Sequence, residues 1–346
     1  MSYRIAVLGA GSWGTALAAL LANNGHKVFL WARDPEQWEK ISRTRENSKY
    51  LPGVSLPQQL NILNNLTEAL SDQDLLVLAV PSHSVRVLAK EISSHINPNT
   101  VIVNTAKGFE PKTFIRLSEV LKEELPAFSH NNITLLSGPS HAEEVGRNLP
   151  TAVVVAAKNK SIAEKIQDIF MTHSFRVYIN LDMTGVEIAG ALKNVIALGT
   201  GISDGLGYGD NAKAALITRG IAEITRLGMR LGAEMQTFAG LAGLGDLVVT
   251  CTSMHSRNRR AGIQIGQGQN LSVVLRNMGM VVEGINTTQA AYHLAHKYEI
   301  VMPITEQMFK VLFEGKNPKE AVVSLMSRSK THEGEREMLN LADSKV

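Results

Sequence analysis

The chain has 346 residues with a formal net charge of +3, and its 44% apolar and 19% charged residues are typical of a globular protein. That length exceeds one ordinary hydrophobic core, so we expect two domains. The small charge and dispersed basic residues argue against a nucleic-acid partner, and no apolar run approaches the roughly 18 to 20 residues that cross a bilayer, so we expect no membrane partner.

The first half alternates short β-branched or Leu-rich runs with amphipathic stretches, which is typical of a parallel sheet covered by helices. We expect strands at Arg4–Gly9, Lys27–Trp31, Leu75–Val80, Val101–Ala106, Ile133–Ser137, Thr151–Ala157 and Arg176–Ile179. We expect helices between them at Gly14–Asn23, Ser84–Ser93, Thr113–Leu125 and Ser161–Phe170. The sequence therefore predicts an α/β domain with a mostly parallel, doubly wound sheet over residues 1–185.

Strand patterns stop near Asp182, and the rest of the chain is predicted to be an all-helical domain over residues 186–346. The helices are expected at Leu181–Gly201, Asn211–Leu231, Gly262–Gln267, Leu271–Met278, Gly284–Tyr298, Pro303–Phe313 and Pro318–Met326. No Pro- or Ser-rich linker separates the halves, so a strand should lead directly into a long helix. The polar tail Thr331–Val346 is expected to fray.

A glycine-rich loop, Gly9-Ala10-Gly11-Ser12-Trp13-Gly14, follows the first strand and opens the first helix. In that context Gly9 permits a tight turn, Gly11 lets a pyrophosphate approach the backbone, and Gly14 allows close helix packing. The motif predicts a Rossmann dinucleotide-binding domain whose helix N-terminus, with Ser12 and Trp13, meets the phosphates. The alternatives are a turn without ligand and, for Trp13, a packing role.

The second strand ends at Arg33-Asp34, about the ~20-residue distance at which an acidic residue contacts an unphosphorylated ribose. Arg33 comes first in this register and can grip a 2′-phosphate, which favours NADP(H). NAD(H) remains an alternative cofactor, because Asp34 is acidic and could contact an unphosphorylated ribose. A solvated Arg33 paired with Asp34 is the alternative without a cofactor role.

Reactive side chains follow two later strands. Asn104-Thr105-Ala106-Lys107-Gly108 closes one strand, and Gly138-Pro139-Ser140-His141-Ala142 closes the next. The carboxyl ends of strands in an open α/β sheet face the ligand crevice, so both segments should point at the cofactor. A solvent-exposed Lys107 without function is the alternative.

Lys193 stands inside the apolar helix Ala191–Ala197. Burial lowers the pKa of a lysine towards neutrality, which makes Lys193 a candidate general acid or base. Its alternative is to extend to the surface. Farther on, Ser256 is a candidate N-cap, so Ser256-Arg257-Asn258 before the helical run Arg259–Gln267 predicts an anion site, or else a solvated basic turn.

The sequence start and the single cysteine indicate a cytoplasmic location. A strand-like run follows Met1 at once and leaves no room for a signal peptide. Cys251 is the only cysteine, which agrees with a reducing compartment, and we expect a buried, unreactive thiol. No metal site is expected.

Four separated motifs together resemble the bacterial NAD(P)-dependent sn-glycerol-3-phosphate dehydrogenases over nearly the whole length. They are the glycine-rich loop extended to Ala16, the helix pair Ala191–Glu223, the segment Phe238–Asn258, and Val281-Val282-Glu283-Gly284. One departure is visible at His141, where the family pattern leads us to expect an aromatic such as Phe. The resemblance implies hydride transfer between NAD(P)(H) and dihydroxyacetone phosphate or sn-glycerol 3-phosphate, feeding glycerophospholipid synthesis.

The resemblance also implies roles for individual residues. Lys193 would exchange the proton, with Lys107 and Asp246 beside it as further catalytic residues. Substrate contacts would come from Lys107, Gly138, Ser140, Lys193, Asp246, Ser256, Arg257 and Asn258. Cofactor contacts would come from Gly9, Gly11, Ser12, Trp13, Gly14, Arg33, Lys107, Ala142, Arg257, Val281 and Glu283.

Two other functions are alternatives to this interpretation. Another two-domain hydroxy-acid or acyl-CoA dehydrogenase could share both domains, but it would not need the phosphate-binding Ser256-Arg257-Asn258. A non-catalytic NAD(P)-binding redox sensor could keep the nucleotide loop with purely structural lysines. A scaffold protein explains none of the motifs. Helical domains of this kind often pair, so a homodimer is an alternative to a monomer, although no residue indicates an interface.

Overall fold

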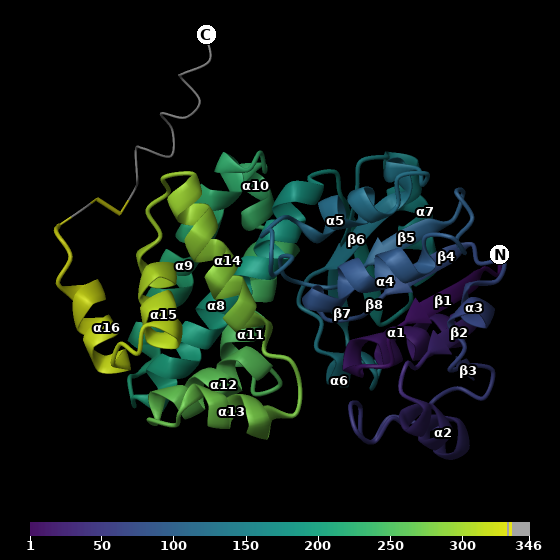
Figure 1. Ribbon diagram of the computed structural model, residues 1–346, viewed down its shortest axis with the longest axis horizontal. Coiled ribbons are helices and arrows are strands. Elements are labelled where there is room, and N and C mark those ends of the chain that lie inside the picture. The colour runs from purple at the N-terminus through teal and green to yellow at the C-terminus, as the bar shows by residue number, and fades with distance from the viewer. Residues whose placement is uncertain (331, 334–346) are drawn as a thin grey trace, which may run out of the picture.

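The computed structural model describes residues 1–330 and 332–333. Figure 1 shows two halves side by side, with the sheet and its helices in the N-terminal half and only helices in the C-terminal half. The predicted fraying of Thr331–Val346 falls, apart from residues 332 and 333, outside the described residues.

A single sheet of eight strands forms the N-terminal half, in the order β3-β2-β1-β4-β5-β6-β7-β8. Its strands are β1 (Arg4–Leu8), β2 (Lys27–Trp31), β3 (Asn61–Leu63), β4 (Leu75–Leu78), β5 (Val101–Asn104), β6 (Ile133–Ser137), β7 (Thr151–Ala157) and β8 (Phe175–Asn180). All neighbours are parallel except β6 and β7, which pair antiparallel. The first six strands follow the doubly wound Rossmann order, which confirms the predicted fold class.

Both faces of the sheet are apolar because helices cover both. In β1, Ile5 and Val7 belong to the core on one face, and Ala6 and Leu8 to the core on the other. Because both faces of the sheet are buried, the strand sequences are continuous apolar runs. The covering helices are α1 (Ser12–Asn23), α2 (Pro35–Thr44), α3 (Leu66–Leu70), α4 (Val85–Ile92), α5 (Leu117–Glu124), α6 (Ala142–Val145) and α7 (Lys160–Phe170), with short η1 (Ser82–Ser84) and η2 (His130–Asn132).

Several of these elements were missed by the sequence pattern. β3 and α3 span only three and five residues, too few to establish a period. α2 buries only Ile41, and its start is fixed by the Asp34 side chain, which accepts from Glu36 N, and by Pro35 in the first turn. A helix that contributes so little to the core carries almost no apolar signal.

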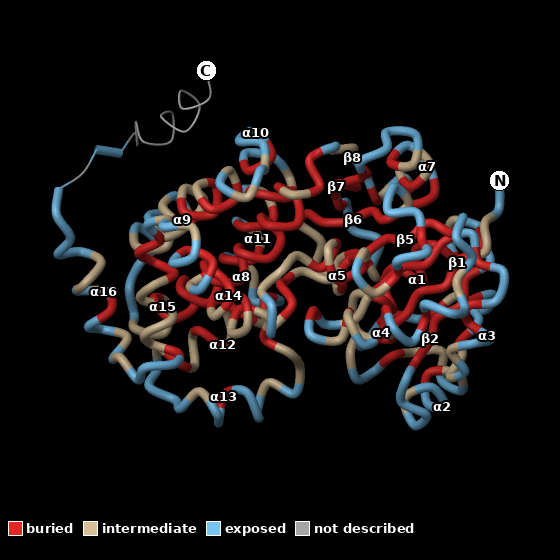
Figure 2. The backbone as a smooth tube through the Cα atoms, turned by 45° about the horizontal axis from the view of Figure 1, so that its top comes forward, coloured by how far each residue is buried: buried red, intermediate tan, exposed pale blue. Residues whose placement is uncertain are grey.

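The C-terminal half packs its helices around α8. Its elements are α8 (Met183–Gly205), α9 (Asp210–Arg230), α10 (Met235–Phe238), the π-helix η3 (Leu241–Gly245), α11 (Asp246–Thr252), α12 (Arg257–Gly266), α13 (Leu271–Met278), α14 (Glu283–Lys297), α15 (Pro303–Phe313) and α16 (Pro318–Met326). The sequence pattern missed α10, η3 and α11, and it began α12 too late. Figure 2 shows α8 as a buried rod inside this half.

By length and composition, α8 could cross a membrane, contrary to the expectation that no run is long enough. Its most apolar window is 100% buried inside the protein, so α8 is a core helix. Bent by 48°, Met235–Thr252 and Arg257–Gly266 pass the same test only as a pair.

α8 and α12 cross in direct backbone contact. A Cβ on Gly201 would stand 2.2 Å from the Arg259 carbonyl oxygen, and one on Gly262 would stand 2.2 Å from the Leu198 carbonyl oxygen. These glycines therefore let the helices approach more closely than any side chain would allow. The crossing brings the N-terminus of α12 next to the part of α8 that carries Lys193.

The halves are joined by side chains as well as by the chain itself. Glu187 of α8 accepts hydrogen bonds from Ser118 N (2.8 Å) and Ser118 Oγ (2.6 Å) at the start of α5, and it pairs with Arg116 at 3.3 Å. Phe109, from the loop after β5, is 2% exposed and belongs to the helical core. The loop that follows Lys107 is thus anchored in both halves.

Candidate active site

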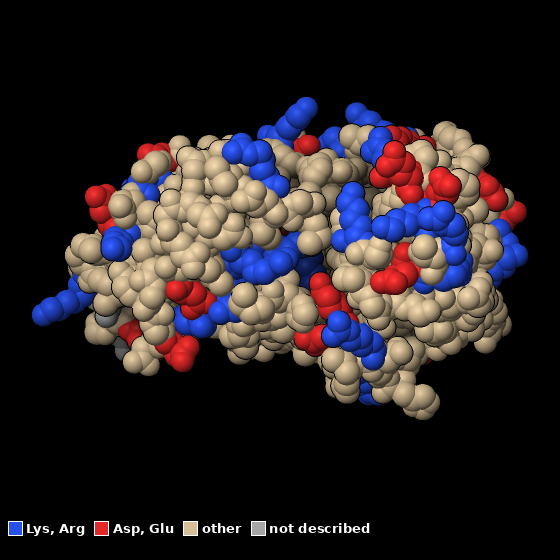
Figure 3. All heavy atoms as spheres, turned by 90° about the horizontal axis from the view of Figure 1, so that it is seen from below, with Lys and Arg blue, Asp and Glu red and all other residues tan. Residues whose placement is uncertain are grey.

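A cleft of about 860 Å³ lies between the two halves. Parallel strands β1, β4, β5 and β6 end at its N-terminal wall, and α8, α11, α12 and α14 form the opposite wall. Figure 3 shows Lys and Arg side chains gathered beside the hollow between the halves. Basic residues that line the cleft are Arg33, Lys107, Lys193, Arg257 and Arg260.

The glycine-rich loop forms one end of the cleft. Gly9 has φ +116°, a conformation that favours glycine, and a Cβ on Gly14 would stand 1.9 Å from the Gly9 carbonyl oxygen. Apart from its neighbours in the chain, no atom of the described residues lies within 4 Å of the Cβ position of Gly11, the N-cap of α1, and no side chain among them caps this helix. The space over Gly11 and the uncapped first turn fit a dinucleotide diphosphate.

Ser12 and Trp13 line the same end. The Trp13 ring also packs against the core of the sheet domain, so it is both a packing residue and part of the cleft wall. Its indole nitrogen is buried without a hydrogen-bond partner among the described residues.

Arg33 and Asp34 line the cleft beyond the glycine-rich loop. The alternative in which they pair with each other is wrong, because Asp34 caps α2 and Arg33 lies 3.6 Å from Glu91 instead. The Arg33 side chain is 69% exposed. An exposed guanidinium therefore borders the cleft, while the nearby Asp34 carboxylate already accepts a hydrogen bond from Glu36 N.

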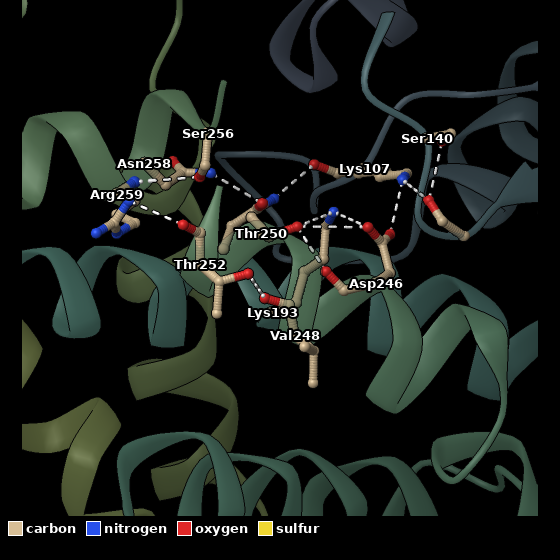
Figure 4. Close-up of polar contacts among 12 residues, drawn as sticks. Lys107, Ser140, Lys193, Asp246, Val248, Thr250, Thr252, Ser256, Asn258 and Arg259 are labelled. Carbon is tan, nitrogen blue, oxygen red and sulfur yellow. Dashed lines mark hydrogen bonds and ion pairs between the residues drawn. The ribbon is translucent and has the colours of Figure 1, made fainter. Parts of the chain in front are cut away.

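Three charged groups meet at the opposite end (Figure 4). Lys107 Nζ donates to Asp246 Oδ2 at 2.7 Å and to the Gly138 carbonyl at 3.0 Å. Lys193 Nζ donates to Asp246 Oδ1 and to Thr250 Oγ1, the latter at 2.8 Å. One carboxylate thus joins a lysine from each half of the protein.

Burial dominates the electrostatics of this group. It lowers the pKa of Lys193 to about 7, with Asp246 opposing the shift and Lys107 adding to it. Burial alone would raise the pKa of Asp246, but the two lysines outweigh it, so the net pKa is lowered. Lys193 is 6% exposed, so the alternative in which it extends to the surface is wrong. A lysine poised near neutrality can both give and take a proton.

Thr250 and Asn194 also line the cleft, and the sequence analysis missed both. Thr250 Oγ1 donates to the Asp246 carbonyl at 2.6 Å, which turns its lone pairs towards Lys193. Asn194 Nδ2 donates to the Lys107 carbonyl at 3.4 Å. Asn194 follows Lys193 directly, and Thr250 lies one helical turn after Asp246. These positions could have indicated both residues once Lys193 and Asp246 were candidates.

The start of α12 faces the cleft with Arg257. Ser256 Oγ accepts from Arg259 N at 3.2 Å, which confirms the predicted N-cap. Arg257 has no hydrogen bond or ion pair with the part of the chain that the structure describes, and burial lowers its pKa. A partly buried, unpaired guanidinium at a helix N-terminus suits an anion rather than a solvated turn.

Asn258 and Glu283, which line the cleft near Arg257, form hydrogen bonds with neighbouring elements. Asn258 donates to Asn194 Oδ1 at 2.9 Å and accepts from Gly284 N at 2.8 Å. Glu283 Oε1 accepts from Ser82 N at 3.0 Å, and Oε2 accepts from Ser82 Oγ at 2.5 Å. The Glu283 carboxylate therefore ties α14 to the loop after β4 across the cleft.

The segment after β6 lines a further part of the cleft. Ser140, His141 and Ala142 line the cleft, and Ser140 Oγ donates to the Gly138 carbonyl at 2.9 Å. His141 lies 5.6 Å from His255, ring centre to ring centre, and burial lowers its pKa. Its Nε2 is buried without a partner among the described residues.

Most candidate residues thus gather around one cleft, and Val281 and Glu283 line it as well. Gly14, Gly138 and Asp246 do not line it. Gly14 packs against Gly9, whereas Gly138 contacts the cleft residue Lys107, and Asp246 contacts both Lys107 and Lys193. Cys251 is fully buried, as expected. Among the described residues, no cluster of His, Cys, Asp or Glu could hold a metal ion.

Comparison with known proteins gives a consistent result. Residues 4–163 match the family described as NAD-dependent glycerol-3-phosphate dehydrogenase N-terminus, and residues 182–323 match its C-terminus. A glycerol-3-phosphate dehydrogenase [NAD(P)+] from Thermoanaerobacter sp. (strain X514) is 56% identical over 95% of this chain and 98% of its own length. The one from Bacillus subtilis (strain 168) is 51% identical over 99% of each.

A solved structure agrees with these sequence relatives. The crystal structure of glycerol-3-phosphate dehydrogenase from Coxiella burnetii superposes with a TM-score of 0.91 at 40% identity, covering 94% of this chain and 99% of that one. The chain therefore belongs to the NAD(P)-dependent glycerol-3-phosphate dehydrogenase family.

Proposed function

We propose that this protein interconverts dihydroxyacetone phosphate and sn-glycerol 3-phosphate with NAD(P)(H). The observation that carries the proposal is one cleft with three parts: a nucleotide loop, a buried Lys193 whose pKa is about 7, and an unpaired Arg257 at a helix N-terminus. A dinucleotide, a proton and a phosphate each have a matching partner there. The relatives carry the name of this activity.

Lys193 exchanges the proton in this proposal. The nicotinamide supplies or accepts a hydride at C4 when it is bound. In reduction, the Lys193 ammonium gives a proton to the C2 oxygen as its carbonyl bond becomes single, and neutral Lys193 takes the proton back in oxidation. Its position between Asp246 and Thr250 fixes the direction of Nζ.

Lys107 and Asp246 adjust the charge at the reacting oxygen. The Lys107 ammonium stabilises negative charge that develops there, as preorganised donors do in other enzymes. Asp246 holds both lysines at one point and offsets part of their charge, so two cations can stay close in a buried place. Asp246 acts through the lysines, because it does not line the cleft.

Substrate and cofactor contacts complete the proposal. Arg257 and the amides at the start of α12 hold the substrate phosphate. The substrate residues are Lys107, Ser140, Lys193, Ser256, Arg257 and Asn258, and Gly138 and Asp246 act through the lysines that they contact. The cofactor residues are Gly9, Gly11, Ser12, Trp13, Gly14, Arg33, Lys107, Ala142, Arg257, Val281 and Glu283. Exposed Arg33 beside the cleft supports NADP(H) as the preferred cofactor, with NAD(H) as the alternative.

We also propose the setting of the reaction. Residues 1–185 bind the dinucleotide, and residues 186–346 supply the acid-base group and the phosphate site. The protein acts in the cytoplasm without a nucleic-acid or membrane partner, as a homodimer, and supplies glycerol 3-phosphate for glycerophospholipid synthesis. The alternative of a non-catalytic redox sensor gives no role to Lys193 or Arg257.

The test is initial rates of cofactor oxidation with dihydroxyacetone phosphate, run side by side with NADPH and NADH. We expect steady turnover, faster at low cofactor concentration with NADPH. Arg257→Ala should lower kcat/KM for dihydroxyacetone phosphate by roughly 10- to 150-fold, the loss expected when a hydrogen bond to a charged group is removed.

Unphosphorylated dihydroxyacetone serves as the control substrate. It should be a poor substrate with both proteins and should lose less than dihydroxyacetone phosphate on Arg257→Ala, because it has no phosphate for Arg257 to bind. Equal losses with both substrates would assign Arg257 to the cofactor or the fold, and no turnover with either cofactor would reject the proposed function.

A further inference from the structure

One basic residue that lines the cleft, Arg260, has no role in the proposed function. That function assigns Arg33 to the 2′-phosphate of NADP(H) and Arg257 to the substrate phosphate. It assigns Lys107 and Lys193 to the reacting oxygen. Arg260 lies on α12 three residues after Arg257, so the two side chains project from the same face of the helix.

The Arg260 side chain has no partner in the part of the chain that the structure describes. The residue is half-buried, its Nε is buried without a hydrogen bond, and its guanidinium forms no ion pair there. Arg259, directly before it, pairs with Asp204 at 2.8 Å and donates to the Thr252 carbonyl at 2.9 Å. Burying part of an unpaired cation is costly, so Arg260 suits an anionic ligand in the cleft.

The nucleotide end of the cleft lacks a free cation on its own wall. A dinucleotide diphosphate carries a negative charge on each phosphate, and the N-terminus of α1 supplies only about half a positive charge. Among the described residues of the N-terminal half, the Lys and Arg side chains that line the cleft are Arg33 and Lys107. Arg33 lies 3.6 Å from Glu91, and Lys107 donates to Asp246 at 2.7 Å. Charge to balance the diphosphate therefore has to come from the opposite wall.

We propose that Arg260 binds the diphosphate of the NAD(P)(H) cofactor from the helical half, opposite the glycine-rich loop. On that wall Lys193 is bonded to Asp246, and Arg257 serves the substrate phosphate in the proposed function, so Arg260 is the cation left for the cofactor. Arg260 acts within the proposed cofactor site, so its assignment rests on that site and not on the identity of the substrate.

The carboxylates of the cleft leave Arg260 available. None of those in the described residues forms an ion pair with it, and Glu283 instead accepts from Ser82 Oγ at 2.5 Å. The carboxylates that line the cleft are Asp34, Glu91, Glu143 and Glu283. A diphosphate that contacts Arg260 on one wall and the glycine-rich loop on the other joins the two halves of the protein.

Binding of cofactor fragments, measured by isothermal titration calorimetry, tests the assignment without turnover. ADP-ribose carries the diphosphate without a 2′-phosphate, and 2′-AMP carries the 2′-phosphate without a diphosphate. Arg260→Gln should raise Kd for ADP-ribose roughly 10- to 150-fold, the loss expected when a hydrogen bond to a charged group is removed, and should leave Kd for 2′-AMP nearly unchanged. Arg260→Lys should restore part of the ADP-ribose affinity, because lysine keeps the charge but not the planar fork.

Arg276→Gln is the matched control. Arg276 is exposed on α13 and does not line the cleft, so this change removes the same charge elsewhere in the helical half and should leave both Kd values unchanged. Arg33→Ala should show the reverse pattern, with weaker binding of 2′-AMP and normal binding of ADP-ribose. The melting temperature of Arg260→Gln should stay normal, because the side chain has no partner in the described residues to lose.

Unchanged ADP-ribose affinity in Arg260→Gln would overturn the assignment. A loss confined to 2′-AMP would place Arg260 at the ribose instead, and a raised KM for dihydroxyacetone phosphate with normal ADP-ribose binding would place it at the substrate phosphate. An unaltered protein that does not bind ADP-ribose would reject the assignment together with the cofactor site. Binding that depends on Arg260 in a protein that does not turn over dihydroxyacetone phosphate would reject the proposed substrate and support the assignment.

Discussion

Lys193 places an ammonium group on a buried helix whose neighbouring side chains, apart from Asn194, are apolar. Burial lowers the pKa of this lysine to about 7. Asp246 and Thr250 accept its hydrogen bonds. A buried lysine that lines a cleft and has a strongly lowered pKa is typical of an active site.

Lys193→Met tests the role of this lysine. Methionine keeps the volume and apolar contacts of the stem, so the protein should fold, while kcat for dihydroxyacetone phosphate reduction should fall roughly 100- to 10,000-fold. NADPH binding, followed by fluorescence titration, should stay near normal. Lys213→Met is the control, because Lys213 pairs with Asp204 outside the cleft. A folded Lys193→Met protein with more than about a tenth of normal kcat would make Lys107 the leading acid-base candidate.

The pKa of Lys193 also predicts opposite pH dependences for the two directions. Reduction needs the protonated ammonium, so kcat/KM for dihydroxyacetone phosphate should fall as the pH rises through about 7. Oxidation needs the neutral amine, so kcat/KM for glycerol 3-phosphate should rise through the same range. Asp246 raises the pKa of Lys193, so Asp246→Asn should move both midpoints to lower pH. Midpoints that do not move would separate Asp246 from the titrating group.

Arg33 decides the cofactor in our interpretation. Arg33→Ala should raise KM for NADPH about tenfold more than KM for NADH, a modest effect because its side chain is 69% exposed and screened by solvent. Glu91→Gln removes a carboxylate 3.6 Å from Arg33 and should change NADPH binding in the opposite direction. Equal changes of KM for both cofactors after Arg33→Ala would exclude a contact with the 2′-phosphate.

At the scale of elements, helix and strand ends make the site. The carboxyl ends of β1, β5 and β6 supply the glycine-rich loop, Lys107 and Ser140, and the N-termini of α11, α12 and α14 supply Asp246, Arg257 and Glu283. Strand ends carry loops that can vary without loss of the sheet, and helix N-termini favour negative charge. This arrangement matches the anionic substrate and cofactor of the proposed reaction.

The tie between η1 and α14 is open to a double-mutant cycle. Ser82 donates twice to Glu283, so Ser82→Ala and Glu283→Ala should be strongly non-additive in NADPH affinity, with a coupling of about 1.5–3 kcal/mol for bonds to a charged group. Ser84→Ala is the control, since Ser84 lines the cleft but, among the described residues, has no hydrogen bond to Glu283. If the Ser82 and Glu283 effects simply add, the tie has no part in shaping the cofactor site.

At the scale of the whole molecule, the cleft is held from two sides. Glu187 joins α8 to the start of α5, and Glu283 joins α14 to the loop after β4. Lys107 and Asp246 add a third connection inside the cleft. These contacts join the two walls between the end that we propose binds the nucleotide and the end that we propose binds the phosphate.

Periodic and local signals determined much of this protein in advance. Buried parallel strands read as apolar runs, and the glycine-rich loop between β1 and α1 marked the nucleotide end. The apolar surroundings of Lys193 and the N-cap pattern at Ser256 indicated two further parts of the candidate site. These features depend on near neighbours in sequence, so the sequence alone could predict the fold class and the main candidate residues.

Only the tertiary structure decided which groups meet. Thr250 and Asn194 were missed because an ordinary threonine or asparagine becomes informative only when helix packing sets it beside Lys193. The short β3, the polar α2 and the small helices before Asp246 carry too few apolar residues to establish a period. Arg33 pairs with Glu91 rather than Asp34, and Lys107 meets Asp246 across the domain boundary. Such contacts join residues far apart in the chain, and their geometry comes from packing, which no local pattern records.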